Sequence, residues 1–397
     1  MRALAAVLCV LALACEPVRG DAATIQSGSA AQLSDDASGG AFAGAQAVHP
    51  RSRRHPRHRP APSTLASRVV LTYTPDRQGI FNQHYAHYMA LLAAATLRCG
   101  VVFSSQAYSR SQSMTGAWTE HASSVFYNVT HVEAHMRSLG VRVLQRGPDG
   151  PQDCVRNLTS SNTQYYRTPA QLRQEVEAVL WTVPPVCSQV VVHIDRVFSS
   201  LQPGLFDDAA AVVDAVRFHD RWHQAAASVL AALPPGGFNA VHLRIEPDAS
   251  TWFKSKPFSM DMYWPMYFDA ARAAGFGPDK LLYMAGGLVE DAQASLLDTF
   301  VKRYASTAVT KETVTNDLGL AAHPVDQQAI IDYLVMLQAD IVVGHPFSTF
   351  SLFLKAERIV KHGRSAFVMI DKGGLMASLN PAQNAQNEAC FDIVRVG

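Results

Sequence analysis

The sequence VVLTYTPDRQGIFNQHYAHYMALLAAATLRCGVVF, residues 69–103, contains the pattern that decides the fold. Residues 69–73 are a short β-prone run, and residues 74–79 follow as a loop rich in turn-forming residues. We expect a helix from Asn82 through Leu97, after which residues 100–103 return to a β-prone run. This β-loop-α-β unit predicts a parallel sheet whose faces are covered by helices.

The same alternation continues on both sides of Pro-Pro-Gly-Gly at residues 234–237, a strong break in the pattern. The segments expected before the break are helices at 132–139, 169–180 and, as one long amphipathic helix, 209–233, with strands at 141–144 and 190–194. Those expected after it are helices at 262–274, 291–304, 325–338 and 350–360, with strands at 239–243, 281–285 and 341–343. The fold class is therefore α/β, with two Rossmann-like halves that bind ligands in a cleft at the carboxyl ends of their strands.

Composition divides the chain into four segments. Residues 1–20 contain a basic residue, an apolar stretch and small residues suited to cleavage, which is the pattern of a secretory signal peptide. The apolar stretch is shorter than the roughly 20 residues that cross a bilayer, which favours cleavage over an uncleaved anchor. Residues 21–66, rich in Ala, Ser and Gly and then in Pro, Arg and His, predict a disordered stem. Residues 67–234 and 235–397 are the two expected domains. With a secretory signal, the protein is expected in the lumen of the endoplasmic reticulum or Golgi, or outside the cell.

Overall composition excludes several classes of function. With 48% hydrophobic residues, 17% charged residues and a formal net charge of +1, the chain has no global attraction to nucleic acid or to acidic membranes. Membrane contact is expected only if the N-terminal segment stays uncleaved. The sequence has no HExxH pair, GxSxG elbow, GxGxxG loop or GxxxxGK[ST] loop, which argues against zinc hydrolases, esterases, dinucleotide enzymes and P-loop enzymes.

Cysteines and acceptor sequons fit an oxidising compartment. Outside the signal segment the chain has four cysteines: Cys99, Cys154, Cys187 and Cys390. They permit two disulfides in any of three connectivities, and because no CxxC unit occurs among them a zinc site is not expected. Two triplets match the N-glycosylation acceptor pattern, at Asn128 and at Asn157.

A first group of functional candidates lies at residues 240–248, AVHLRIEPD, where a buried strand runs into polar residues. Strand alternation places His242, Arg244 and Glu246 on one face, with Asp248 beyond the proline. The guanidinium of Arg244 can hold the diphosphate of a leaving nucleotide and stabilise negative charge as a glycosidic bond breaks. A simple ion pair between Arg244 and Glu246 is the alternative.

Two further segments contain candidates for nucleotide binding. Asp332 lies on an otherwise apolar helix, and a carboxylate matches two adjacent N–H donors of guanine. Ser348 and Thr349 open a helix as N-cap residues, where exposed N–H groups bind phosphate, although a cap without a ligand is the alternative. In the first loop, Gly79 allows close approach of a phosphate or sugar, and Asn82 can cap the following helix while it touches the ligand.

In this order, the three segments resemble the GDP-fucose protein O-fucosyltransferase superfamily. Residues 242–248, HLRIEPD, look like its HxRxExD signature, and residues 79–83, GIFNQ, look like its GxxNQ loop. Residues 282–287 and 309–312 are similar to further blocks of the family, and the resemblance extends from residue 69 to about residue 395. The segment from Ile331 to Ser351 is particularly similar to the type that acts on thrombospondin repeats.

The resemblance implies a GT-B fold and metal-independent, inverting transfer from GDP-fucose to a Ser or Thr hydroxyl of a luminal protein. By that resemblance Arg244 would be the catalytic residue, in contact with the β-phosphate and the glycosidic oxygen, and Asp332 would read guanine. The first loop would face the sugar, His242 and Asp248 would support the donor pocket, and Ser348 to Phe350 would line the diphosphate and base. The implied donor-binding residues are Gly79, Ile80, Phe81, Asn82, His242, Arg244, Asp248, Asp332, Ser348, Thr349 and Phe350.

Neither a cofactor nor a metal is implied, and the expected partners are a nucleotide sugar and a protein or glycan acceptor. The chain has Gly79 where the thrombospondin type has a glutamate thought to act as base, so a mechanism with sugar-cation character, driven by Arg244, is easier to defend. Two other hypotheses are a related transferase that uses another donor, such as UDP-rhamnose, on a polysaccharide, and a non-catalytic protein that binds GDP-sugars.

Overall fold

The computed structural model describes residues 63–75, 79–110, 117–147, 154–158, 168–195, 197, 206–244, 263–286, 291–314, 323–346, 348–362 and 366–370. The predicted signal segment and the stem as far as residue 62 lie outside the described residues, as do Asp248 and Cys390. Helix α2 (Ser63–Arg68) begins inside the stretch predicted as stem, and its Leu65 is buried.

A parallel sheet forms the first lobe, with the order β5-β2-β1-β7-β6 in the described part of the chain. Its strands are β1 (Val69–Tyr73), β2 (Gly100–Val102), β5 (Arg142–Leu144), β6 (Val155–Leu158) and β7 (Val190–Ile194). The first strand lies in the centre and is almost wholly buried, as expected for a Val- and Leu-rich strand covered on both faces. Strands β2 and β5 lie on one side of β1, and the later strands β7 and β6 lie on its other side. The strand order therefore reverses beside β1.

Helices cover this sheet, and a short antiparallel hairpin adjoins it. The elements are α3 (Ile80–Leu97), α4 (Val129–Ser138), α5 (Pro169–Leu180), α6 (Ala209–Ala215), the 3-10 turn η1 (Ser123–Val125), and the hairpin strands β3 (Gln106–Arg110) and β4 (Trp118–Ala122). A capping box between Thr168 and Gln171, with Pro169 at the first helical position, fixes the start of α5. The hairpin was not predicted.

The second lobe repeats the architecture, with the sheet order β10-β9-β8-β11-β12 among the described residues. Its strands are β8 (Phe238–Leu243), β9 (Leu281–Gly286), β10 (Thr307–Val309), β11 (Val342–Gly344) and β12 (Phe367–Met369). Its helices are α7 (Asp220–Ala232), α9 (Tyr263–Ala273), α10 (Asp291–Tyr304), α11 (Lys311–Val314), α12 (Val325–Met336) and α13 (Thr349–His362). Here the order reverses between β8 and β11, and all six residues of β8 are buried.

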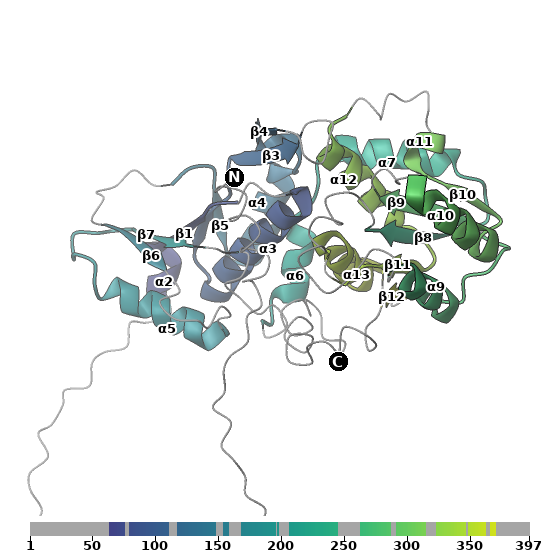
Figure 1. Ribbon diagram of the computed structural model, residues 1–397. Helices are drawn as coiled ribbons and strands as arrows, with labels where there is room; N and C mark the ends of the chain where they lie inside the picture. The colour runs from purple at the N-terminus through teal and green to yellow at the C-terminus, as the bar shows by residue number, and fades with distance from the viewer. Residues whose placement is uncertain are drawn as a thin grey trace, which may run out of the picture.

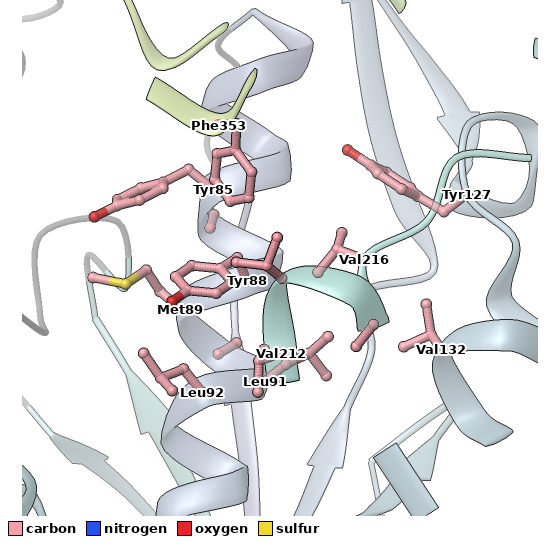
Figure 2. Close-up of a cluster of buried hydrophobic side chains, with 14 of the residues drawn as sticks. Tyr85, Tyr88, Met89, Leu91, Leu92, Tyr127, Val132, Val212, Val216 and Phe353 are labelled. Carbon is pink, nitrogen blue, oxygen red and sulfur yellow. The ribbon is translucent and has the colours of Figure 1, made fainter. Parts of the chain in front are cut away.

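One continuous apolar core joins the two lobes. Helix α3 is apolar on all sides and buried along almost its whole length, because it lies between its own sheet and the helices α6 and α13 (Figure 1). Phe353 of α13 packs edge-on against Tyr85 and Tyr88 of α3, with ring centroids 5.7 and 5.3 Å apart (Figure 2). The start of α3 and the start of α13 are therefore held in a fixed relation to each other.

The single helix predicted for residues 209–233 is wrong. The structure has two helices there, α6 and α7, and the residues between them pair with another segment: Phe218 forms an antiparallel bridge with Tyr127. His219 N–H donates to the Phe126 carbonyl at 2.7 Å, and Asn128 N–H to the Arg217 carbonyl at 2.9 Å. Helix α6 packs against α3 and α4 of the first lobe and α13 of the second, whereas α7 packs against α12, so tertiary contacts interrupt a locally helical sequence. The domain boundary between residues 234 and 235 stays a prediction.

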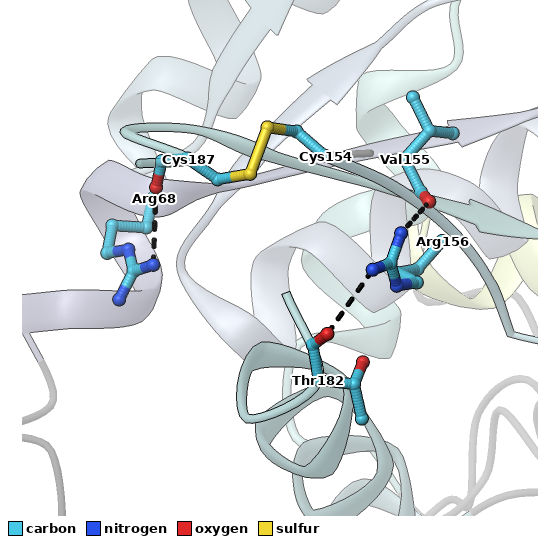
Figure 3. The surroundings of a disulfide bond; sticks show 6 residues. All are labelled: Arg68, Cys154, Val155, Arg156, Thr182 and Cys187. Carbon is cyan, nitrogen blue, oxygen red and sulfur yellow. Dashed lines mark hydrogen bonds between the residues drawn. A yellow bond between two sulfur atoms is a disulfide. The ribbon is translucent and has the colours of Figure 1, made fainter. Parts of the chain in front are cut away.

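A disulfide joins Cys154 to Cys187, just before the adjacent strands β6 and β7 (Figure 3). The sequence left the connectivity open, and this bond identifies one pair. It closes a loop with a sequence separation of 33, for which restriction of the unfolded chain contributes roughly 3–4 kcal/mol of stability. Cys99 is a buried free thiol among the described residues, and burial raises its pKa to about 12, so it is unreactive at neutral pH.

The turn at residues 234–237 depends on glycine. Gly237 has a φ of +77°, and a Cβ there would lie 2.5 Å from an oxygen of Asp340.

In the described part of the chain, no helix combines the length and the apolar character needed to cross a bilayer.

Candidate active site

Loops from both lobes meet where the strand order reverses. The loop after β1 leads into α3, residue 244 follows β8, and residues 345–348 connect β11 to α13. The parallel pairing of β8 with β11, Val342 beside Ala240 and Val343 beside Val241, brings the carboxyl ends of these two strands together. Such reversal points are where doubly wound sheets bind their ligands.

The starts of α3 and α13 touch each other directly. The Thr349 hydroxyl donates to Asn82 Oδ1 at 2.7 Å, across 267 residues of sequence. The ring of Phe81 packs edge-on against Phe350 with centroids 4.7 Å apart. Two of the three segments singled out from the sequence therefore lie together, one from each lobe.

The third segment reaches the same place through His242. Its ring stacks on Phe350 at 4.2 Å, and its Nδ1 lies 2.8 Å from Ser351 Oγ. Burial, with a smaller contribution from the charge of Arg244, lowers the pKa of His242 to about 3. The imidazole is therefore neutral at physiological pH and lines the site without adding charge.

Arg244 follows β8 at a point fixed by a tyrosine. The Arg244 N–H donates to Tyr267 Oη at 2.9 Å, and that hydroxyl donates to the His242 carbonyl at 2.9 Å. The pKa of His345 is held well below its usual 6.5 first by burial, and then by His242 and Arg244. Arg244 therefore directly follows His242 and Leu243 at the carboxyl end of β8, the strand that pairs with β11.

Gly344 allows this close approach at the end of β11. Without a side chain at residue 344, Phe367 and the first turn of α13 can lie against the end of β11. A Cβ on Gly344 would lie 2.6 Å from a ring carbon of Phe367 and 2.9 Å from Ser351 Oγ. Ser351 Oγ in turn accepts the His345 N–H at 2.9 Å. A larger residue at position 344 would push the first turn of α13 away from the strand ends.

A buried ion pair that was not predicted holds the first loop. Asp326, in the first turn of α12, accepts bonds from the Ile80 N–H at 3.2 Å and from the backbone, Nε and NH2 nitrogens of Arg110 at 2.7, 3.3 and 3.1 Å. Asp326 is 1% exposed. The loop, the β3 hairpin and the second lobe are thus fastened at one carboxylate.

One prediction about the first loop is wrong. Helix α3 begins at Ile80, so Asn82 lies inside the first turn and does not cap the helix; its side-chain oxygen accepts from Thr349 instead. Gly79 has an ordinary φ of −51°, and a Cβ on it would meet its nearest atoms at 3.4 and 3.7 Å, so close approach of a phosphate or sugar at Gly79 stays a prediction. Gln83 binds both backbone groups of Tyr108, at 2.7 and 2.8 Å, which is a structural role.

Asp332 forms a buried ion pair with a partner outside this cluster. It accepts from Tyr283 Oη at 2.6 Å and from Lys311 Nζ at 2.9 Å, and Lys311 also contacts Glu312 at 2.6 Å. Burial raises the pKa of the Asp332 carboxyl, and Lys311 opposes that shift. Each carboxylate oxygen already accepts one bond within the chain, and recognition of guanine by Asp332 stays a prediction.

The structure thus brings together Phe81, Asn82, His242, Arg244, Thr349 and Phe350, with Ile80 fixed by Asp326 and Ser348 beside the helix start. Asp248 and its neighbours 245–247 lie outside the described residues. The missed pair, Arg110 and Asp326, had no signal beyond one acidic residue in the first turn of a predicted helix.

Two doubly wound parallel sheets, whose reversal-point loops meet beside an arginine and a helix start, define a GT-B-like glycosyltransferase. The chain belongs to the GDP-fucose protein O-fucosyltransferase family, whose sequence model matches residues 72–361.

Solved structures with the same fold include POFUT1 in complex with GDP, at 14% identity and a TM-score of 0.50 over 77% of this chain and 98% of that chain. POFUT1 in complex with GDP-fucose matches at 12% identity and a TM-score of 0.50 over the same shares of both chains. A search of curated proteins found no match.

Proposed function

We propose that this protein transfers fucose from GDP-fucose, with inversion and without a metal, to a Ser or Thr hydroxyl of a protein in the lumen of the secretory pathway. The observation that carries the proposal is the convergence of Arg244, the first loop and the start of α13 at the reversal points of the two sheets. Membership of the O-fucosyltransferase family supports it, as do the GDP and GDP-fucose bound to POFUT1.

The chemistry follows from where positive charge is placed. When the bond between the sugar and the diphosphate breaks, negative charge develops on the β-phosphate. The guanidinium of Arg244 and the N–H groups that open α13 offset that charge, while His242 and His345 stay neutral. The carboxylate beside the first loop, that of Asp326, already accepts hydrogen bonds from Arg110 and from the Ile80 N–H. It is therefore poorly suited to act as the general base, which favours a mechanism driven by stabilisation of the leaving phosphate.

We expect GDP at about 100 times its dissociation constant to raise the Tm by about 4–6 °C, because a ligand at that concentration stabilises the folded state by about 2.7 kcal/mol. Differential scanning fluorimetry with GDP, UDP and their sugars measures this shift. A larger shift with UDP than with GDP would contradict the proposed donor and favour a UDP-sugar such as UDP-rhamnose.

The same assay tests whether Asp332 reads guanine. Inosine diphosphate lacks the exocyclic amine, so a carboxylate that accepts from both guanine donors should bind it about 10- to 100-fold more weakly than GDP. Equal affinity for the two nucleotides would show that Asp332 serves only its buried pair with Lys311. Binding of GDP without turnover of GDP-fucose on any Ser- or Thr-containing acceptor would indicate a non-catalytic homologue.

The luminal location predicts a glycan on Asn157. This residue is exposed on β6 at the edge of the first sheet, whereas Asn128 accepts the His131 N–H at 3.0 Å as the N-cap of α4. Protein expressed in a eukaryotic secretory system should shift in mobility after removal of N-glycans, and the variant Asn157→Gln should lose that shift. An unglycosylated secreted protein would argue against this assignment, and the Cys154–Cys187 disulfide supports an oxidising compartment.

A further inference from the structure

Two histidines and an aspartate lie together in the first lobe, away from the donor loops. His131 and His135 are one turn apart on α4, and Asp214 faces them from α6. One ligand atom of each residue lies within 4.8 Å of the other two, and all three residues are partly exposed. We propose that this cluster binds one Zn²⁺ ion, with water as the fourth ligand.

The residue types and spacing suit zinc. Positions i and i+4 of a helix share one face, so both imidazoles reach the same point above it. Zinc binds histidine nitrogen and aspartate oxygen at about 2.0–2.1 Å, so tetrahedral ligand atoms lie about 3.3 Å apart. His135 Nδ1 and Asp214 Oδ2 are already 3.7 Å apart, and since the three ligand atoms lie within 4.8 Å of one another, each pair has to approach by at most about 1.5 Å.

The hydrogen bonds behind the histidines prepare them as ligands. His131 Nε2 lies 2.9 Å from the Asp214 carbonyl, and His135 Nε2 lies 2.9 Å from the Ala211 carbonyl. A carbonyl oxygen only accepts, so each Nε2 carries a hydrogen and each neutral ring presents its lone pair at Nδ1. Metal-bound histidines characteristically donate their other nitrogen to a carbonyl or carboxylate in this way.

The carboxylate is also held in place. Lys361, near the end of α13, donates to Asp214 Oδ1 at 3.0 Å and to Glu357 Oε1 at 2.6 Å. Asp214 Oδ2 is the oxygen that faces His135. An ion bound there joins α4 to α6 directly and α13 through Lys361.

This site is separate from the transfer reaction. Lys361 is twelve residues along α13 from Thr349, which corresponds to about 18 Å of helix. The bound zinc acts on stability, because it holds α4 to α6 and, through Lys361, to α13, and the proposed metal-independent transfer does not depend on it.

The experiment titrates Zn²⁺ into the full chain, produced without a polyhistidine tag and freed of metal with a chelator. Isothermal titration calorimetry should show an equivalent of zinc that the variant His135→Gln binds at least about 100-fold more weakly. Glutamine can still donate to the Ala211 carbonyl, so this variant removes the ligand nitrogen and keeps the hydrogen bond behind it. The Asp214→Asn variant should lose the same equivalent.

The control is His121→Gln on β4, a partly exposed histidine outside the cluster that contacts Ser109 Oγ at 2.8 Å. Zinc at about 100 times its dissociation constant should raise the Tm of the wild type and the control by about 4–6 °C, and leave that of His135→Gln unchanged. Zinc affinity and stoichiometry that are the same in His135→Gln and Asp214→Asn as in the wild type would overturn the proposal. Absence of binding at zinc concentrations up to about 1 mM would also overturn it, because a dissociation constant of that size corresponds to a binding free energy of only about 4 kcal/mol.

Discussion

Replacement of Arg244 by alanine is expected to lower kcat for sugar transfer by about 100- to 1000-fold, the range found when a single group that stabilises developing charge is removed. Arg244 directly follows β8, at the carboxyl end of the strand that pairs with β11, and after burial its charge also contributes to the lowered pKa of His242 and His345. The loss should appear in kcat more than in the dissociation constant of GDP-fucose, because the charge on the leaving phosphate is greatest in the transition state. Single-turnover measurements with GDP-fucose and a Ser- or Thr-containing acceptor separate the two quantities.

Two variants sharpen this test. Arg244→Lys keeps the charge but loses the two-pronged geometry, so it should recover only part of the rate. Arg272→Ala on α9 removes an exposed arginine, 75% exposed and paired with Asp269, and should change neither rate nor stability. If Arg244→Ala folds normally and transfers the sugar at the wild-type rate, the assignment of Arg244 as the catalytic residue is wrong.

Most of the fold could be predicted because the pattern is local. Runs such as Val69–Tyr73 and Val190–Ile194 contain enough β-branched residues to be recognised as strands, and the cap at Thr168 marks the start of α5. The elements that were missed are short or depend on tertiary contacts. The β3 hairpin is held partly by Gln83, and the break between α6 and α7 by the pairing of Phe218 with Tyr127.

The candidate site was predictable to the extent that its residues lie in recognisable motifs. Asn82, His242 and Phe350 could be named from the sequence, yet their contacts are tertiary. Asn82 meets Thr349 between the lobes, and His242 stacks on Phe350 within the second lobe. The same limit explains the error at Asn82, and it leaves the role of Asp332 a prediction, because a local pattern does not tell which partner a polar side chain finds. Tyr283 and Lys311 are distant in sequence from Asp332 and occupy both of its oxygens.

The second large effect is expected from Asp326, whose carboxylate fastens the first loop to the second lobe. Replacement by alanine leaves the Arg110 charge, whose side chain is 16% exposed, without this partner, and it also removes the acceptor of the Ile80 N–H. Loss of one member of a buried ion pair typically costs about 3–5 kcal/mol, since the other charge stays desolvated. The free energy of unfolding, measured by urea denaturation, should fall by about that amount, and GDP-fucose should bind more weakly because Asn82 loses its fixed position.

A double variant distinguishes the ion pair from a general loss of packing. Arg110→Met with Asp326→Leu removes both charges and should be more stable than Asp326→Ala alone, because no uncompensated charge remains. Asp298→Ala is the matched surface control: Asp298 is 58% exposed and pairs with Lys302 on α10, so its loss should cost at most about 0.5 kcal/mol. If Asp326→Ala costs no more than this control, the carboxylate does not hold the loop. The convergence of the two lobes would then depend on other contacts, such as the Thr349–Asn82 hydrogen bond and the packing of Phe81 against Phe350.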